Sequence, residues 1–155
     1  MREGRPLSDV AVAIAASAGV LLLADLGLSW QSIDVTSGAV SLRVAATGWA
    51  NGGLLAGFVT IALLVYLTRP LRVGGVTDVP QAAVGGILGL ASLGFTVAAA
   101  FTGASPVTTS AGAVQVGHHL WPAYAGIGIA AVAAAGALFV LAGVFRGTAA
   151  PPPAG

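Results

Sequence analysis

Asp25 is an ionisable residue inside an apolar stretch of this sequence, LLLADLGLSW. Ionisable groups within membrane segments are costly, and they often bind or carry ions. Trp30 follows about one helical turn later and marks the edge of the stretch. The sequence therefore favours an interfacial carboxylate at Asp25, which either pairs with Arg43 or is solvated, and a proton or cation site is the alternative.

His118 and His119 are the other candidates for chemistry, because imidazole titrates near neutral pH and binds metals. Neighbouring side chains do not point the same way on a strand or a helix. No third Cys, His or carboxylate follows at ligand spacing. The pair therefore indicates histidines of an interfacial loop, and a weak metal site completed by Asp34 or Asp25 is the alternative.

The remaining sequence offers no supported catalytic motif. The chain has no cysteine, which excludes disulfides, thiol nucleophiles and cysteine-based metal sites. The stretch RVGGVTDVP lacks the lysine and the strand-to-helix context of a phosphate loop. A net charge of +1 without a basic run gives no basis for nucleic-acid binding. We predict a protein that is not an enzyme and has no cofactor or bound metal.

The elements that carry these residues are expected to be membrane helices. The 155-residue chain is 57% hydrophobic and only 7% charged, whereas soluble domains carry about 25% charged residues. Four apolar segments stand out, at residues 10–29, 52–67, 82–101 and 121–145. About 20 helical residues cross a membrane core, a length that the second segment reaches only with residues 49–51 and 68. The sequence predicts an all-α membrane protein, a four-transmembrane-helix bundle.

Arginine sets the expected orientation of the bundle. Arg43 is the single arginine between the first and second segments, and the other five fall on the opposite side. Positive residues in short loops favour the cytoplasm, so we predict a multi-pass plasma-membrane protein with both termini cytoplasmic. Tryptophan and tyrosine favour membrane surfaces. The aromatic residues expected at the outer surface are Trp30, Trp49, Trp121 and Tyr124.

The outer loops are predicted to form β-hairpins. The segment SIDVTSGAVSLRV, residues 32–44, alternates apolar and polar residues around Thr36-Ser37-Gly38, and residues 107–116 repeat this pattern around Ser110-Ala111-Gly112. Because one isolated hairpin is marginally stable, we expect the two to form a four-stranded sheet across the outer helix ends, with apolar side chains facing inward. The sheet either caps the helices or receives a partner.

The domain organisation is expected to be simple. Residues 1–147 form one transmembrane domain, and the proline-rich residues 148–155 form a disordered tail. The first apolar run exceeds the 7–15 residues of a signal peptide, so an uncleaved first helix is expected. Residues 9–68 and 81–146 share an order of helix, hairpin and tryptophan-started helix, which leaves duplication and chance both open.

Small residues spaced four apart are expected to let helices approach closely. The spacing occurs at Ala15 and Gly19, at Gly53 and Gly57, and at Gly85 and Gly89. It indicates packing within the bundle or against helices of another protein.

Several features together resemble a known group of proteins. They are LGLSW at residues 26–30, Gly48-Trp49 at the second helix, arginines after that helix, and an aromatic start to an Ala/Gly/Leu-rich fourth helix. The chain resembles small four-helix membrane proteins of actinobacteria, among them the tryptophan-associated membrane proteins. The resemblance implies the four-helix fold but no functional residues. A looser likeness is to claudin-type proteins, whose paired loop cysteines this chain lacks.

The expected function follows from small size, glycine-rich faces and the absence of catalytic motifs. We expect a non-enzymatic accessory or assembly subunit whose partners are the lipid bilayer and other membrane protein subunits or further copies of itself. The alternative is a small transporter or ligand-binding membrane protein with an outer-face site near Asp25 and His118-His119.

Overall fold

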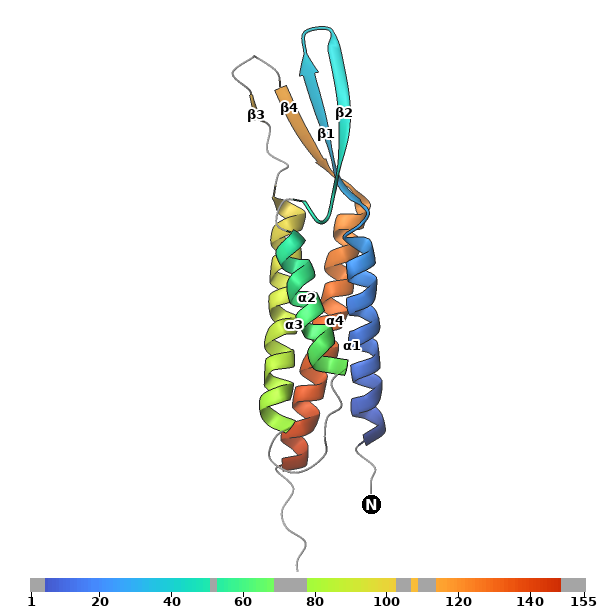
Figure 1. The fold of residues 1–155 in the computed structure, drawn as a ribbon, viewed down its shortest axis with the longest axis vertical. Coiled ribbons are helices and arrows are strands. Elements are labelled where there is room, and N and C mark those ends of the chain that lie inside the picture. Colours follow the sequence, from blue (N-terminus) through green and yellow to red (C-terminus); the bar gives the residue numbers. More distant parts are fainter. Residues whose placement is uncertain (1–4, 51–52, 69–77, 103–106, 109–113, 149–155) are drawn as a thin grey trace, which may run out of the picture.

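The computed structural model describes residues 5–50, 53–68, 78–102, 107–108 and 114–148. In this part of the chain, four helices form an elongated bundle, and a β-sheet extends beyond one end of it (Figure 1). The helices are α1 (Arg5–Asp25), α2 (Gly53–Thr68), α3 (Asp78–Phe101) and α4 (Trp121–Thr148). The strands are β1 (Ser29–Ser37), β2 (Val40–Thr47), β3 (Val107–Thr108) and β4 (Val114–His119).

Small residues allow the helices to pack closely, because backbones approach where side chains are short. A Cβ at Gly89 of α3 would lie 3.1 Å from the Cα of Ala134 in α4. A Cβ at Gly136 of α4 would lie 2.9 Å from the Cβ of Ala15 in α1. A Cβ at Gly19 would lie 3.0 Å from a methyl carbon of Leu64 in α2. A larger side chain at any of these positions would therefore crowd the neighbouring helix.

The other small residues singled out in the sequence have different surroundings. A Cβ at Gly57 would overlap the ring of Trp49, and a Cβ at Gly53 would overlap the carbonyl of Gly48. Both glycines therefore make room for the turn that precedes α2. Gly85 is buried, but a Cβ there would have no described atom within 4 Å, because the residue lines a small cavity between α3 and residues of the other helices such as Val12 and Val140.

A chain of buried hydroxyl groups links α2 to α3. The Oγ1 of Thr60 lies 2.7 Å from the Oγ of Ser92, and the same hydroxyl donates to the carbonyl of Ala56 at 2.7 Å. Thr96 donates to the carbonyl of Ser92, also at 2.7 Å. Each hydroxyl thus has a partner, which removes most of the cost of burying it.

Two helices in the described part of the chain are long and apolar enough to cross a membrane. They are Pro80–Phe101 within α3 and Trp121–Arg146 within α4. The 16 residues of α2 span about 24 Å, short of a hydrocarbon core of about 30 Å. In α1, the uncharged stretch between Asp9 and Asp25 is about 22 Å long. The expected bundle of four transmembrane helices is therefore wrong, and the sheet makes the fold mixed α/β rather than all-α.

The first hairpin is confirmed, and it is longer than predicted. β1 continues through Ser37, so the loop consists of Gly38 and Ala39. Gly38 has a φ of +59°, a left-handed conformation that glycine adopts without strain and that two-residue hairpin loops require. The turn predicted at Ser110-Ala111-Gly112 lies outside the described residues.

The two hairpins join into one antiparallel sheet with the strand order β2-β1-β4-β3. β1 pairs with β2 on one side and with β4 on the other. The sheet continues the long axis of the bundle instead of lying across the helix ends (Figure 1). The expectation that its apolar side chains face the helices is therefore wrong. The duplication stays a prediction. In a duplicated chain β1 would correspond to β3 and β2 to β4, whereas the centre of this sheet is formed by β1 and β4, which do not correspond.

Candidate functional site

The junction between the bundle and the sheet is built around Trp30, which is only 1% exposed. Its indole Nε1 donates to the backbone carbonyl of Asp25 at 3.0 Å and to the Oδ2 of the same residue at 3.1 Å. The pKa of the Asp25 carboxyl is raised, because the effect of burial exceeds that of the hydrogen bond from Trp30, which lowers the pKa. The end of α1 is thus fastened to the start of β1.

The same pair of side chains holds α4 in place. A Cβ at Gly126 of α4 would lie 2.6 Å from both the Oδ2 of Asp25 and a ring carbon of Trp30, so only glycine fits. The carbonyl of Trp30 also accepts a hydrogen bond from the N–H of Leu120 at 2.8 Å, one residue before α4 begins. These contacts give Asp25 a structural role at a meeting point of α1, β1 and α4.

His119 lies in a cluster of aromatic rings at the end of β4. Its ring makes edge-to-face contacts with Phe101 at 5.9 Å and with Tyr124 at 6.5 Å between centroids. Its Nδ1 is buried and has no hydrogen-bond partner among the residues described. Next to it, the side-chain amide of Gln31 donates to the carbonyl of Thr102, just after α3. These contacts join β1 and β4 to the end of α3 and the start of α4.

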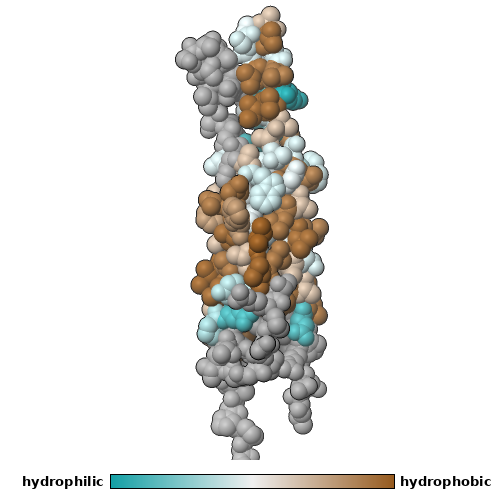
Figure 2. All heavy atoms as spheres, in the orientation of Figure 1, coloured by the Kyte–Doolittle hydropathy of each residue, from teal (hydrophilic) through white to brown (hydrophobic). Residues whose placement is uncertain are grey.

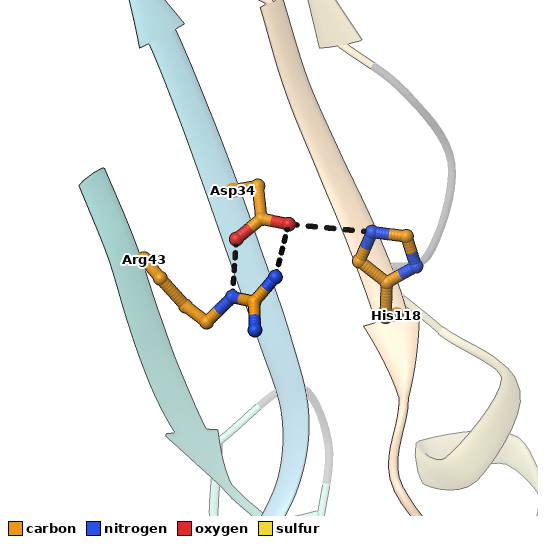
Figure 3. A network of polar contacts seen from close by, with 3 residues as sticks. All are labelled: Asp34, Arg43 and His118. Atoms are coloured by element: carbon orange, nitrogen blue, oxygen red, sulfur yellow. Dashed lines mark hydrogen bonds and ion pairs between the residues drawn. The ribbon is translucent and has the colours of Figure 1, made fainter. Parts of the chain in front are cut away.

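One face of the sheet carries a polar network (Figure 3). Asp34 of β1 lies opposite Arg43 of β2, whose Nε and one terminal nitrogen donate to the two carboxylate oxygens at 2.6 Å and 3.0 Å. The Nε2 of His118 lies 3.4 Å from the Oδ2 of Asp34. The hydrogen bond from Arg43, aided by the charges of Arg43 and His118, lowers the pKa of the Asp34 carboxyl. Asp34 therefore bridges β1 to both neighbouring strands.

On β1 and β2 the opposite face of the sheet is apolar, and its β2 side chains are exposed. Direct cross-strand pairs join Ile33 to Val44 and Val35 to Leu42, so these side chains share one face, and alternation adds Val40. We call these five residues the apolar sheet face. On β2, Val40 is 70% exposed, Leu42 is 61% exposed and Val44 is 47% exposed. Figure 2 shows apolar atoms gathered over this end of the molecule.

The residues predicted from the sequence are only partly brought together. Arg43 pairs with Asp34 and not with Asp25, so the expected Asp25–Arg43 pair is wrong. His118 lies on the polar face beside Asp34, and His119 lies against the aromatic rings. The described residues hold no group of three His, Asp or Glu side chains placed to bind a metal.

The aromatic residues expected at an outer surface differ from one another. Trp121 and Tyr124 lie exposed at the sheet end of α4. Trp49 packs against the core cluster that contains Leu26 and Trp30. Trp30 itself lies at the start of β1, at the sheet end of the bundle, and its ring is buried.

No protein-family model and no curated protein matches this chain. The likeness to small four-helix actinobacterial membrane proteins stays a prediction. The function must therefore be argued from the geometry of the chain itself.

Sequence reasoning missed Asp34 as the centre of the polar network. The signal was present, because a loop at Gly38-Ala39 places residue 34 opposite residue 43. The bond from Trp30 to Asp25 had no comparable signal, since it requires α1 to end at Asp25 and the chain to turn directly into β1.

Proposed function

We propose that this protein is a non-enzymatic subunit of a membrane assembly, which α3 and α4 anchor and which docks through the apolar sheet face. One observation carries the proposal: five apolar side chains lie on a single-layer sheet that projects beyond the bundle (Figure 1). A sheet with one apolar face normally buries that face against a second layer. Contiguous exposed apolar patches mark interaction sites.

The proposed orientation follows from the two ends of the molecule. α1 begins at Arg5, and the last turn of α4 holds Arg146, both at the end opposite the sheet (Figure 1). Positive residues favour the cytoplasmic side, whereas Trp121 and Tyr124 lie at the sheet end, where aromatic rings favour a membrane surface. We propose a multi-pass plasma-membrane protein in which α3 and α4 cross the membrane, with the C-terminus in the cytoplasm and the sheet outside the cell.

The test compares two substitutions on the same strand. Leu42→Asp places a charge on the apolar sheet face, and Ser41→Asp places the same charge on the opposite face. C-terminally tagged variants are purified from native membranes in a mild detergent and sized on native gels. We expect the wild type and Ser41→Asp to migrate as an assembly, and Leu42→Asp to migrate as a single chain. A wild type that migrates as a single 15.0 kDa chain in its micelle contradicts the proposal.

A second candidate function, a small proton or cation transporter, is favoured by one observation. The carboxyl group of Asp25 is buried at the junction, where a membrane surface would lie in the proposed orientation. Asp25→Asn should then abolish proton or cation flux in reconstituted vesicles. Unchanged flux removes the candidate, because Asp25 is the charged group on which it depends.

A further inference from the structure

We infer that the occupant of the apolar sheet face is a second copy of this chain, which packs side by side with the first in the same membrane. The inference rests on the proposed docking function and names its partner. It draws on the charge distribution of the sheet, on the direction in which the face points, and on a second apolar surface along α2.

The charge distribution favours a partner with the same surface. The five residues of the apolar sheet face include no charged side chain. The charged residues Asp34 and Arg43 lie on the other face and satisfy each other there. Two copies of the apolar sheet face therefore meet without burying an unpaired charge, which would be costly. The face offers no charge by which an oppositely charged surface would recognise it.

The direction of the face suits a two-fold pair. The apolar atoms of the sheet are visible in a view across the long axis of the molecule, so the face points sideways (Figure 2). Two copies anchored in one membrane have parallel long axes and hold their sheets at the same height. A two-fold axis along the membrane normal then brings each apolar sheet face against the other, as in a two-layer sandwich.

The available area requires a contribution from α2. The exposed parts of Val40, Leu42 and Val44 amount to on the order of 300 Å², whereas a standard interface takes about 800 Å² from each partner. α2 lies in front of α3 and α4 in the same view (Figure 1), and apolar atoms also gather over the bundle on this side (Figure 2). The exposed large side chains of α2 are Leu54, Leu55, Phe58, Ile61 and Val65, which we call the α2 stripe. With the α2 stripe, the area offered by each copy reaches roughly the standard size.

Cysteine cross-linking tests the inference directly, because the natural chain has no cysteine. Leu42→Cys places one thiol on the apolar sheet face, and Ser41→Cys places one on the opposite face of the same exposed strand. Membranes that contain each single-cysteine variant are treated with a short bis-maleimide and examined on denaturing gels. We expect Leu42→Cys to form a species of twice the 15.0 kDa chain mass at least tenfold more than Ser41→Cys.

Two differently tagged copies of Leu42→Cys identify the partner in that species. Both tags in one cross-linked band support the second copy. A band that contains one tag and a different protein overturns this inference but leaves docking through the sheet intact. Equal cross-linking of Leu42→Cys and Ser41→Cys contradicts both proposals. Phe58→Cys on the α2 stripe gives an independent check, since it should also link two tagged copies.

Discussion

At the residue scale, Asp34 is the charged group whose ionisation the sheet depends on. In the folded chain, Arg43 and His118 lower the pKa of its carboxyl from 3.8, so the carboxylate stabilises the sheet when it is ionised. That stabilisation is fully present above the unfolded pKa and is lost as the pH falls through the folded pKa. We expect hydrogen-exchange protection factors of β1 and β2 amides to decrease as the pH falls below about 4. Asp34→Asn should lower the protection at neutral pH and flatten its pH dependence.

The control for this experiment is Asp9→Asn, which changes an exposed carboxylate in α1 and leaves the sheet network intact. Its pH profile should follow that of the wild type. If Asp34→Asn loses protection on acidification as steeply as the wild type, a different carboxylate governs the sheet.

The indole of Trp30 is expected to stabilise the fold through its bond to Asp25. Trp30→Phe leaves the buried carboxylate without this donor, which costs about 1–3 kcal/mol on top of any lost packing. In an Asp25→Asn background the same substitution should cost about 1 kcal/mol less, because the charge is gone. Denaturant unfolding in detergent measures all four members of the cycle. Trp121→Phe, at an exposed ring, is the control and should stay within about 0.5 kcal/mol.

The pairing of Asp34 with Arg43 could have been predicted from the sequence, whereas the bond between Trp30 and Asp25 could not. Alternation in SIDVTSGAVSLRV defines the hairpin, but placing the turn at Thr36-Ser37-Gly38 instead of Gly38-Ala39 shifts the register and hides the pair of Asp34 and Arg43. The bond from Trp30 to Asp25 depends on where α1 ends, and apolarity alone continued that helix to residue 29. Helix ends are set by local hydrogen bonds that hydropathy does not report.

At the element scale, the position of α4 depends on glycines that face its neighbours. Gly126 and Gly128 are a matched pair, since a Cβ at Gly126 would meet Asp25 and Trp30 whereas a Cβ at Gly128 has nothing within 4 Å. We expect Gly126→Ala to destabilise the protein by about 1–3 kcal/mol through overpacking. Gly128→Ala should be neutral or stabilising by up to about 1 kcal/mol, because alanine favours helix. Thermal unfolding followed by circular dichroism distinguishes the two, and equal effects contradict close packing at Gly126.

Apolar composition predicted the positions of the four helices but not which of them are long enough to cross a membrane. Each predicted apolar segment overlaps a helix, yet α2 is too short to cross a membrane alone and α1 carries the charged residues Asp9 and Asp25. Spacing of small residues identified the contacts of Gly19 and Gly89. It missed Gly136, which allows α1 and α4 to meet, because an alanine- and glycine-rich helix offers many equivalent spacings and the sequence does not reveal which face is turned inward.

At the scale of the whole molecule, an apolar bundle and an amphipathic sheet follow each other along one axis (Figure 1). The sheet is held to the helices at the Trp30 junction, and beyond it β2 is exposed along nearly all of its length. A single sheet layer without a covering layer buries little apolar area, so the ion pair on one face adds to its stability, and the partner proposed for the other face would add more. The polar network and the apolar sheet face thus have different roles. The polar network keeps the strands in register, and the apolar sheet face is proposed to bind a second copy of the chain.

The orientation of the whole molecule yields the last prediction. Ser41→Cys introduces a single thiol on the exposed strand β2, and a cysteine added after Gly155 introduces one at the C-terminus. Because Arg146 lies in the last turn of α4, at the side opposite the sheet, a membrane-impermeant maleimide should label Ser41→Cys in intact cells. The C-terminal cysteine should be labelled only after the cells are permeabilised. The reverse pattern places the sheet in the cytoplasm, and labelling of both thiols in intact cells means that the helices do not separate the two ends across a membrane.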